Sequence, residues 1–185
     1  MRAFRGEDVR NVGSGNIGAT NVWRSYGHWL GVPVIAVDMA KGFVPAFLAT
    51  LYVDPLAGVL AGGAAMLGHW RPLFLGFQRG GKMVATATGA FFGVAPLLGA
   101  AAAAVWALVF FAFRYASVAS IVTALAVPVA AVALGEPWPV IVFSVLAAVA
   151  VLIVHRTNIG RLRAGTEKRF RFRRGAEPSN LGASR

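Results

Sequence analysis

The stretch VATATGAFFGVAPLLGAAAAAVWALVFFAF, residues 84–113, decides the topology of this chain. It contains no charged residue and is too long for one membrane crossing, which needs about 20 residues. Pro96, three positions after Gly93, lacks a backbone N–H and interrupts a regular helix. We therefore expect two helices, 84–95 and 97–113, that reverse direction near the proline.

Four further apolar stretches occupy residues 29–53, 56–68, 117–134 and 138–154. With the two helices from 84–113, the expected number of membrane helices is about six. The chain has 185 residues, of which 57% are hydrophobic and only 14% are charged. Because a water-soluble domain carries about 25% charged residues, the composition predicts an all-α integral membrane protein. The chain has no cysteine, which excludes disulfides and a thiolate nucleophile.

The distribution of charge supports the division at Pro96. With residues 1–28 inside, the inner segments are 1–28, 69–83, 114–116 and 155–185. Together they hold every Lys and Arg except the lysine within 29–53. Cytoplasmic loops of membrane proteins are enriched in these residues. In a soluble protein the net charge of +11 would suggest nucleic acid. Here the membrane topology accounts for the positive charge, and no nucleic-acid-binding motif is present. No nucleic-acid partner is therefore expected.

Helices 56–68 and 84–95 are too short for a hydrocarbon core of about 30 Å. The loop between them, from His69 to Lys82, is therefore expected to lie about 10 Å below the cytoplasmic surface, within protein. His69 ends a helix, where a histidine is more often a hydrogen-bonding cap than a catalyst. We expect it to support the site.

Asp38 and Lys41 lie inside the apolar segment 29–53, near the depth of the recessed loop. Ionisable groups at such positions are costly and often functional. Three residues apart on a helix, the two can also neutralise each other. We favour a supporting ion pair beside the site.

A first polar motif, GSGNIGATN, occupies residues 13–21 and is followed by an arginine. Glycines let backbone N–H groups approach an anion, and hydroxyl, amide and guanidinium donors suit phosphate. An ordinary turn before a helix fits the same residues. The candidate phosphate-binding residues are Ser14, Gly15, Asn16, Asn21 and Arg24.

The second and third motifs are GHWRP with FQRGGK, within 68–82, and HRTNIGRLRAGTE, at 155–167. The Gly-Gly-Lys sequence does not fit P-loop spacing and is interpreted as a backbone anion nest with a lysine. In the third motif, His155 and Asn158 share a helical face. The imidazole can act there as a general base, or can merely be favoured by the helix dipole. Glu167 is expected to orient a cation, and the histidines are not spaced for zinc.

The three motifs, in this order and topology, resemble the bacterial acyl-phosphate-dependent glycerol-3-phosphate acyltransferases, the PlsY family. The matching pieces are SGNIGATNV (14–22) with Arg24, D-x-x-K-G (38–42), GHxxP (68–72) with GGK (80–82), and HxxNIxRLxxGxE (155–167). The resemblance extends from about residue 9 to 167. It implies transfer of a fatty acyl group from acyl phosphate to the 1-hydroxyl of glycerol 3-phosphate, giving lysophosphatidic acid and phosphate in phospholipid biosynthesis.

The resemblance also implies roles for residues. Phosphate groups are expected on Ser14, Arg24 and Lys82, with the backbone of Gly80 and Gly81 cradling the acyl phosphate. The catalytic residues would be His155, Asn158 and Ser14. The proton acceptor, His155 or a substrate phosphate, is left open. The family needs no metal, other cofactor or acyl-CoA, and membrane lipids are the further partners, with no protein partner implied. The expected location is the bacterial plasma membrane, with the site on the cytoplasmic face.

Two departures from the family accompany the resemblance. Its members usually carry another membrane helix before the first motif, which this chain is expected to lack, and Met83 stands where they usually have glycine. Residues 1–167 are expected to form one membrane domain and 168–185 a basic, disordered cytoplasmic tail. Two other functions remain open. One is a membrane transporter of a phosphorylated solute, and the other is an inactive relative that binds lipid phosphate.

Overall fold

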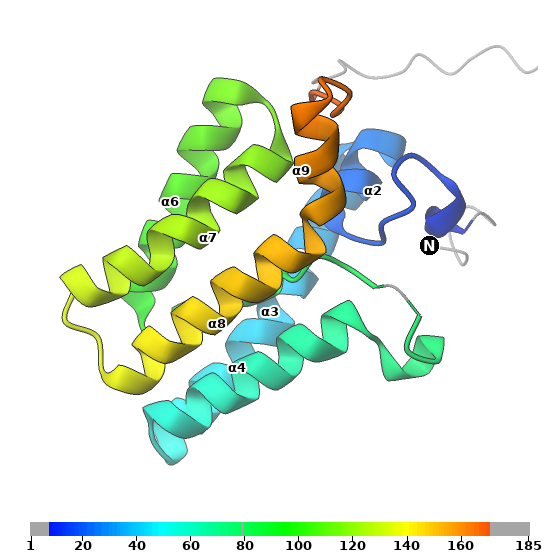
Figure 1. Ribbon diagram of the computed structural model, residues 1–185. Coiled ribbons are helices and arrows are strands. Elements are labelled where there is room, and N and C mark those ends of the chain that lie inside the picture. The colour runs from blue at the N-terminus through cyan, green and yellow to red at the C-terminus, as the bar shows by residue number, and fades with distance from the viewer. Residues whose placement is uncertain (1–7, 79, 171–185) are drawn as a thin grey trace, which may run out of the picture.

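The computed structural model describes residues 8–78 and 80–170, which form helices and no strand (Figure 1). Each of the six predicted apolar helices is present, with ends within two residues of the prediction. The elements are η1 (Val9–Asn11), α2 (Ala19–Tyr26), α3 (His28–Tyr52), α4 (Pro55–Trp70), η2 (Leu73–Leu75), α5 (Val84–Val94), α6 (Pro96–Phe113), α7 (Ala116–Ala133), α8 (Trp138–Val154) and α9 (Arg156–Arg163).

The apolar stretch 84–113 is divided where its proline predicts. Helix α5 ends at Val94, and Ala95 leaves the helical conformation, with φ −149° and ψ 84°. Pro96 then occupies the first turn of α6, where its missing N–H removes no helical hydrogen bond. The division into two helices is confirmed.

The helices have the length and surface of an integral membrane protein. By length and composition α3, α6 and α7 can each cross a membrane, and α8 with α9 makes a fourth if this pair, bent by 58°, counts as one span. Helices α4 and α5 have 16 and 11 residues, or about 24 and 16 Å. They are the expected short pair. Large apolar side chains face outward, among them Leu108, Phe111 and Val129.

The short helix α5 lies inside the bundle, against α3, α4, α6 and α8. Its closest approach is to α3, where glycines bring the two backbones together. A Cβ on Gly42 would overlap the carbonyl oxygen of Thr86, and one on Gly89 would overlap that of Met39. Because α5 follows directly after the Gly-Gly-Lys sequence, this packing sets the depth of Lys82.

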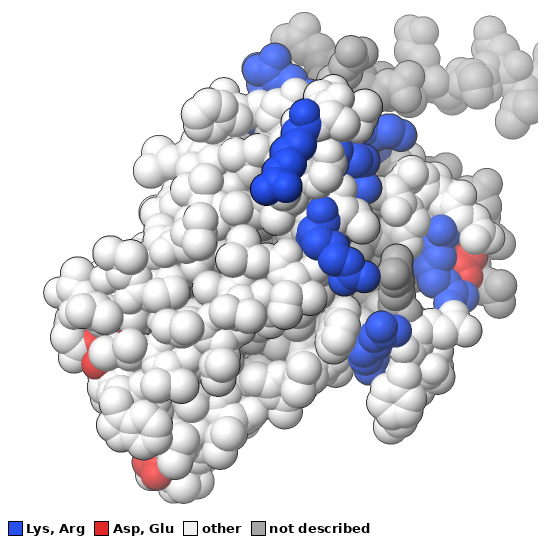
Figure 2. Space-filling view, viewed as in Figure 1, with Lys and Arg blue, Asp and Glu red and all other residues white. Residues whose placement is uncertain are grey.

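Positive charge gathers at one end of the molecule (Figure 2). In that view Lys and Arg side chains cluster over the end where α9 and α2 lie, with an acidic side chain beside them, and further acidic side chains appear at the opposite end (Figures 1 and 2). The turns at that opposite end contain Asp54, between α3 and α4, and Glu136, between α7 and α8. This asymmetry agrees with the charge distribution along the sequence.

The packed part of the chain extends past residue 167, where the tail was expected to begin. Phe170 is buried, and its backbone N–H donates to the carbonyl of Arg114 at 2.6 Å. Residues 168–170 therefore belong with the helices. The remainder of the predicted tail, 171–185, lies outside the described residues.

Candidate active site

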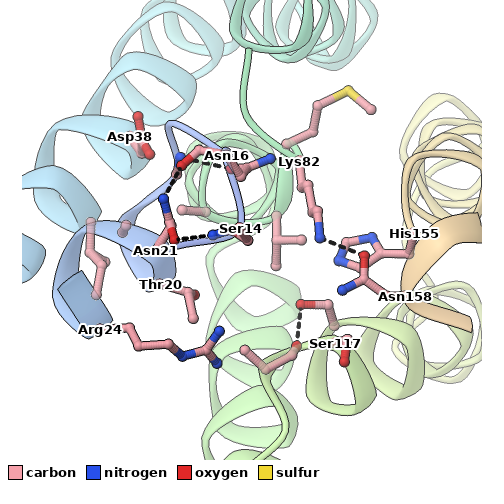
Figure 3. A pocket seen from close by; sticks show the side chains of 18 of the residues that line it. Ser14, Asn16, Thr20, Asn21, Arg24, Asp38, Lys82, Ser117, His155 and Asn158 are labelled. Carbon is pink, nitrogen blue, oxygen red and sulfur yellow. Dashed lines mark hydrogen bonds between the residues drawn. The ribbon is translucent and has the colours of Figure 1, made fainter. Parts of the chain in front are cut away.

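A cavity of about 510 Å³ opens among the three motifs (Figure 3). Its walls come from the loop before α2, the start of α5, the start of α7, and the bend between α8 and α9. Ten of the predicted site residues line it: Ser14, Asn16, Asn21, Arg24, Asp38, His69, Lys82, His155, Asn158 and Glu167. Gly15, Gly80, Gly81 and Lys41 are not among the lining residues. The structure thus brings all three motifs to one site.

A chain of hydrogen bonds joins the second motif to the third. The Lys82 Nζ donates to the Asn158 Oδ1 at 2.5 Å, and the Asn158 Nδ2 donates to the Glu167 Oε1 at 2.7 Å. Glu167 also accepts from the Ser117 Oγ at 2.8 Å and from the Arg161 Nε at 2.6 Å. The amide of Asn158 is therefore held in one orientation, with its oxygen toward the lysine.

The same chain sets the charges at the site. Burial by itself would raise the pKa of Glu167, but hydrogen bonds from Asn158, Arg161 and Ser117 outweigh it, and the pKa lies below its usual value. The carboxylate is thus ionised at neutral pH. Burial lowers the pKa of Lys82 to about 8, opposed by Glu167 and assisted by Arg161 and Arg24. Lys82 is a cation at pH 7 that loses its proton in mildly alkaline solution.

His155 lies at the bend between α8 and α9 and is almost completely buried. Its Nδ1 is 2.8 Å from the carbonyl oxygen of Val151. Because a carbonyl oxygen only accepts hydrogen bonds, Nδ1 must carry a proton. In the neutral ring the Nε2 is then an acceptor. The bend places this imidazole in the cavity wall beside Asn158 and Lys82 (Figure 3).

Arg24 reaches the cavity from the opposite wall, on α2 (Figure 3). Its Nη2 donates to the carbonyl of Lys168 at 3.3 Å, while its Nε is buried without a partner among the described residues. Burial lowers the pKa of Arg24, and Glu167 raises it. An arginine remains charged after such a shift, so this buried N–H is a donor suited to an anion.

The loop before α2 is held by Asn21 rather than left open to a ligand. The Asn21 Nδ2 donates to the carbonyls of Val12 and Asn16, both at 2.9 Å, and its Oδ1 accepts from the Ser14 N–H at 2.9 Å. The Asn16 Oδ1 accepts from the Gly18 N–H at 2.7 Å. These bonds engage the Asn21 side chain, which was expected to contact phosphate. Its structural role is to shape the loop that presents Ser14.

The expected backbone nest at Gly80 and Gly81 differs from the structure. The Gly80 N–H donates to the carbonyl of Trp70, and the Gly81 N–H donates to that of His69, both at 2.9 Å. Neither amide is available to an anion in this conformation. The glycines are needed for space instead, because a Cβ on Gly81 would overlap the imidazole of His69.

Asp38, Lys41 and His69 form the support beneath this loop. The Lys41 Nζ lies 2.5 Å from the Asp38 Oδ1 and 2.5 Å from the His69 Nδ1. An ammonium group only donates, so the Nδ1 of His69 accepts. Asp38 and Lys41 therefore connect α3 to His69, at the end of α4. The imidazole of His69 in turn packs against Gly81.

Several cavity residues were not predicted as site residues, and Ser117, Thr20 and Trp106 are examples. Ser117 begins an apolar segment and carries no motif. Only its proximity to Glu167 in space reveals its role. Among the described residues no three His, Asp or Glu side chains gather as a metal site.

The contact between Gly81 and His69 predicts a specific cost. Gly81→Ala should lower the unfolding temperature in detergent by several degrees, because the added methyl group meets the imidazole. Gly68→Ala is the matched control, since no atom lies within 4 Å of its added Cβ on helix α4. The cost of Gly81→Ala should shrink in a His69→Ala background. Equal effects of both glycine changes would contradict this account.

A family model described as "Glycerol-3-phosphate acyltransferase" matches residues 1–165. Proteins of that name from Desulforudis audaxviator and Roseiflexus sp. are 43% and 46% identical, over 94% and 89% of this chain and 87% and 83% of their own lengths. The crystal structure of PlsY, an integral membrane glycerol 3-phosphate acyltransferase in its glycerol 3-phosphate form, matches with a TM-score of 0.87 and 40% identity, over 91% of this chain and 84% of that chain. This chain therefore belongs to the glycerol-3-phosphate acyltransferase family.

Proposed function

We propose that this protein transfers a fatty acyl group from acyl phosphate to the 1-hydroxyl of glycerol 3-phosphate, giving lysophosphatidic acid and inorganic phosphate. The observation that carries the proposal is the cavity itself. Two half-buried cations, Arg24 and Lys82, face a histidine with an acceptor nitrogen across one cavity. Crystal structures of the relative PlsY are described as its glycerol 3-phosphate and lysophosphatidic acid forms.

The two cations match two phosphate-bearing substrates. Arg24 offers its unpartnered Nε from α2, and Lys82 offers its ammonium from the opposite wall. Ser14 and the N-terminus of α2 supply further donors between them. Side chains and this helix end take over the anion binding that was expected of the Gly80 and Gly81 amides. Asn158, held by Glu167, orients the ammonium.

The reaction is a direct acyl transfer. The O1 of glycerol 3-phosphate attacks the acyl carbonyl carbon, and the bond from that carbon to the phosphate oxygen breaks. The electron pair of the broken bond leaves with inorganic phosphate, whose charge the cations stabilise. The proton of the attacking hydroxyl passes to the Nε2 of His155. The acyl chain lies in the surrounding membrane, so the water-soluble and lipid substrates meet at the cavity.

A turnover assay tests this function. Protein purified in detergent, given palmitoyl phosphate and glycerol 3-phosphate, should form lysophosphatidic acid and inorganic phosphate in equal amounts. A folded protein that binds glycerol 3-phosphate without turnover would instead support an inactive lipid-phosphate-binding relative. Uptake of glycerol 3-phosphate into proteoliposomes without any acyl product would support a transporter.

The role of His155 as proton acceptor predicts a loss of kcat. His155→Gln preserves hydrogen bonding but takes no proton, so kcat should fall by about 10² to 10⁴ with KM little changed. His28→Gln, at the exposed start of α3, is the matched control and should leave both constants unchanged. If the His155→Gln enzyme keeps more than a tenth of wild-type kcat, a substrate phosphate rather than His155 accepts the proton.

The pKa of Lys82 predicts how binding responds to pH. Phosphate needs the ammonium form, so kcat/KM should be maintained up to about pH 8, the pKa of Lys82, and fall above it. Lys82→Arg keeps its charge throughout this range, and its profile should lose the alkaline fall even if its overall value is lower. An unchanged alkaline limb in Lys82→Arg would contradict the assignment.

We also propose that the cavity faces the cytoplasm of a bacterial plasma membrane, because the cavity end carries the Lys and Arg side chains. The chain has no cysteine, so single cysteines can report topology. In spheroplasts, a membrane-impermeant maleimide should label Glu136→Cys, in the turn between α7 and α8. It should label Thr157→Cys, at an exposed position of α9, only after permeabilisation. The reverse pattern would overturn the orientation.

A further inference from the structure

Phe170 lies beyond the third motif, yet it is among the most buried aromatic residues described, with 3% of its surface exposed. Its ring packs edge-on against Phe110 of α6, with centroids 5.2 Å apart, and against Trp23 of α2, at 5.8 Å. It belongs to one apolar cluster with Phe110 and Ala119 of α7. Phe170 thus connects α2 with the pair formed by α6 and α7.

Backbone contacts hold this ring in place. The Phe170 N–H donates to the carbonyl of Arg114, in the turn between α6 and α7. One residue earlier, the Arg169 Nε donates to the carbonyl of Phe113 at 3.3 Å. Residues 168–170 therefore form a short strap, anchored to the end of α6. This strap follows directly after Glu167, which is itself anchored by Ser117 and Asn158.

The strap makes two contacts with Arg24. The carbonyl of Lys168 accepts from the Arg24 Nη2 at 3.3 Å, and the guanidinium carbon lies 5.7 Å from the centre of the Phe170 ring. A cation near an aromatic ring at this distance is attracted to it. Together the carbonyl and the ring engage the guanidinium, whose Nε keeps no partner among the described residues.

We propose that Phe170 is a positioning residue for substrate binding: it holds α2 against the α6–α7 pair and thereby aims the guanidinium of Arg24 into the phosphate-binding cavity. The ring contacts no substrate. It acts through Arg24. The strap also connects Arg24 to Glu167, which orients Lys82 through Asn158 on the opposite wall of the cavity. This inference rests on the proposed function, since that function supplies the phosphate-bearing ligands.

The inference predicts a binding defect. Phe170→Leu keeps much of the apolar volume but removes the ring face, and Phe170→Ala removes both. The Kd for glycerol 3-phosphate or for inorganic phosphate, measured by titration calorimetry in detergent, should rise about fivefold in the first variant and about tenfold or more in the second. The ligand whose Kd rises in the Phe170 variants should be the same ligand whose Kd rises in Arg24→Ala. Phe143→Leu, a buried ring packed on Phe91 outside the cavity lining, is the matched control and should bind normally.

A double-mutant cycle separates positioning from general packing. In an Arg24→Ala background, Phe170→Ala should change the Kd by less than twofold, because the group it positions is gone. Wild-type Kd values in both Phe170 variants, or an equal weakening with and without Arg24, would overturn the inference. Failure of the proposed function would show differently. Wild-type protein would then bind phosphate ligands without acyl transfer, while the Phe170 effect on Kd would persist.

Discussion

The hydrogen bond between Lys82 and Asn158 is the interaction on which this site depends, because it joins two motifs that lie far apart in the sequence. Lys82 precedes α5, and Asn158 lies on α9. Glu167 holds the amide from the other side, so the oxygen of Asn158 must face the ammonium. Without this orientation, a half-buried lysine would face an amide donor and lose its partner.

Close backbone packing makes this hydrogen bond reachable. Helix α5 lies against α3 because Gly42 and Gly89 remove the side chains between their backbones. Met83, the residue before α5, adopts a left-handed backbone with φ 66°, a conformation that favours glycine. Its side chain is buried in the main apolar cluster. The methionine thus fills core space at the cost of some backbone strain.

Much of this architecture follows from patterns that a sequence displays. Helix ends were predictable within two residues because Pro96, charge distribution and segment length constrain them strongly. The convergence of three motifs followed from the same topology. The roles of individual groups did not follow from the sequence, because the three-dimensional structure determines which hydrogen-bond donors already have a partner within the protein. Asn21 uses its amide on the surrounding loop, and Gly80 and Gly81 donate to the end of α4. The burial of Phe170 is not predictable from the sequence, because a single buried aromatic ring leaves no periodic signal.

A crystal structure of this protein with glycerol 3-phosphate bound tests the account most directly. We expect the phosphate inside the cavity, within hydrogen-bonding distance of the Arg24 Nε or the Lys82 Nζ, and the 1-hydroxyl near the Nε2 of His155. A ligand held instead on the exposed arginines of α9, with Arg24 and Lys82 both unoccupied, would contradict it.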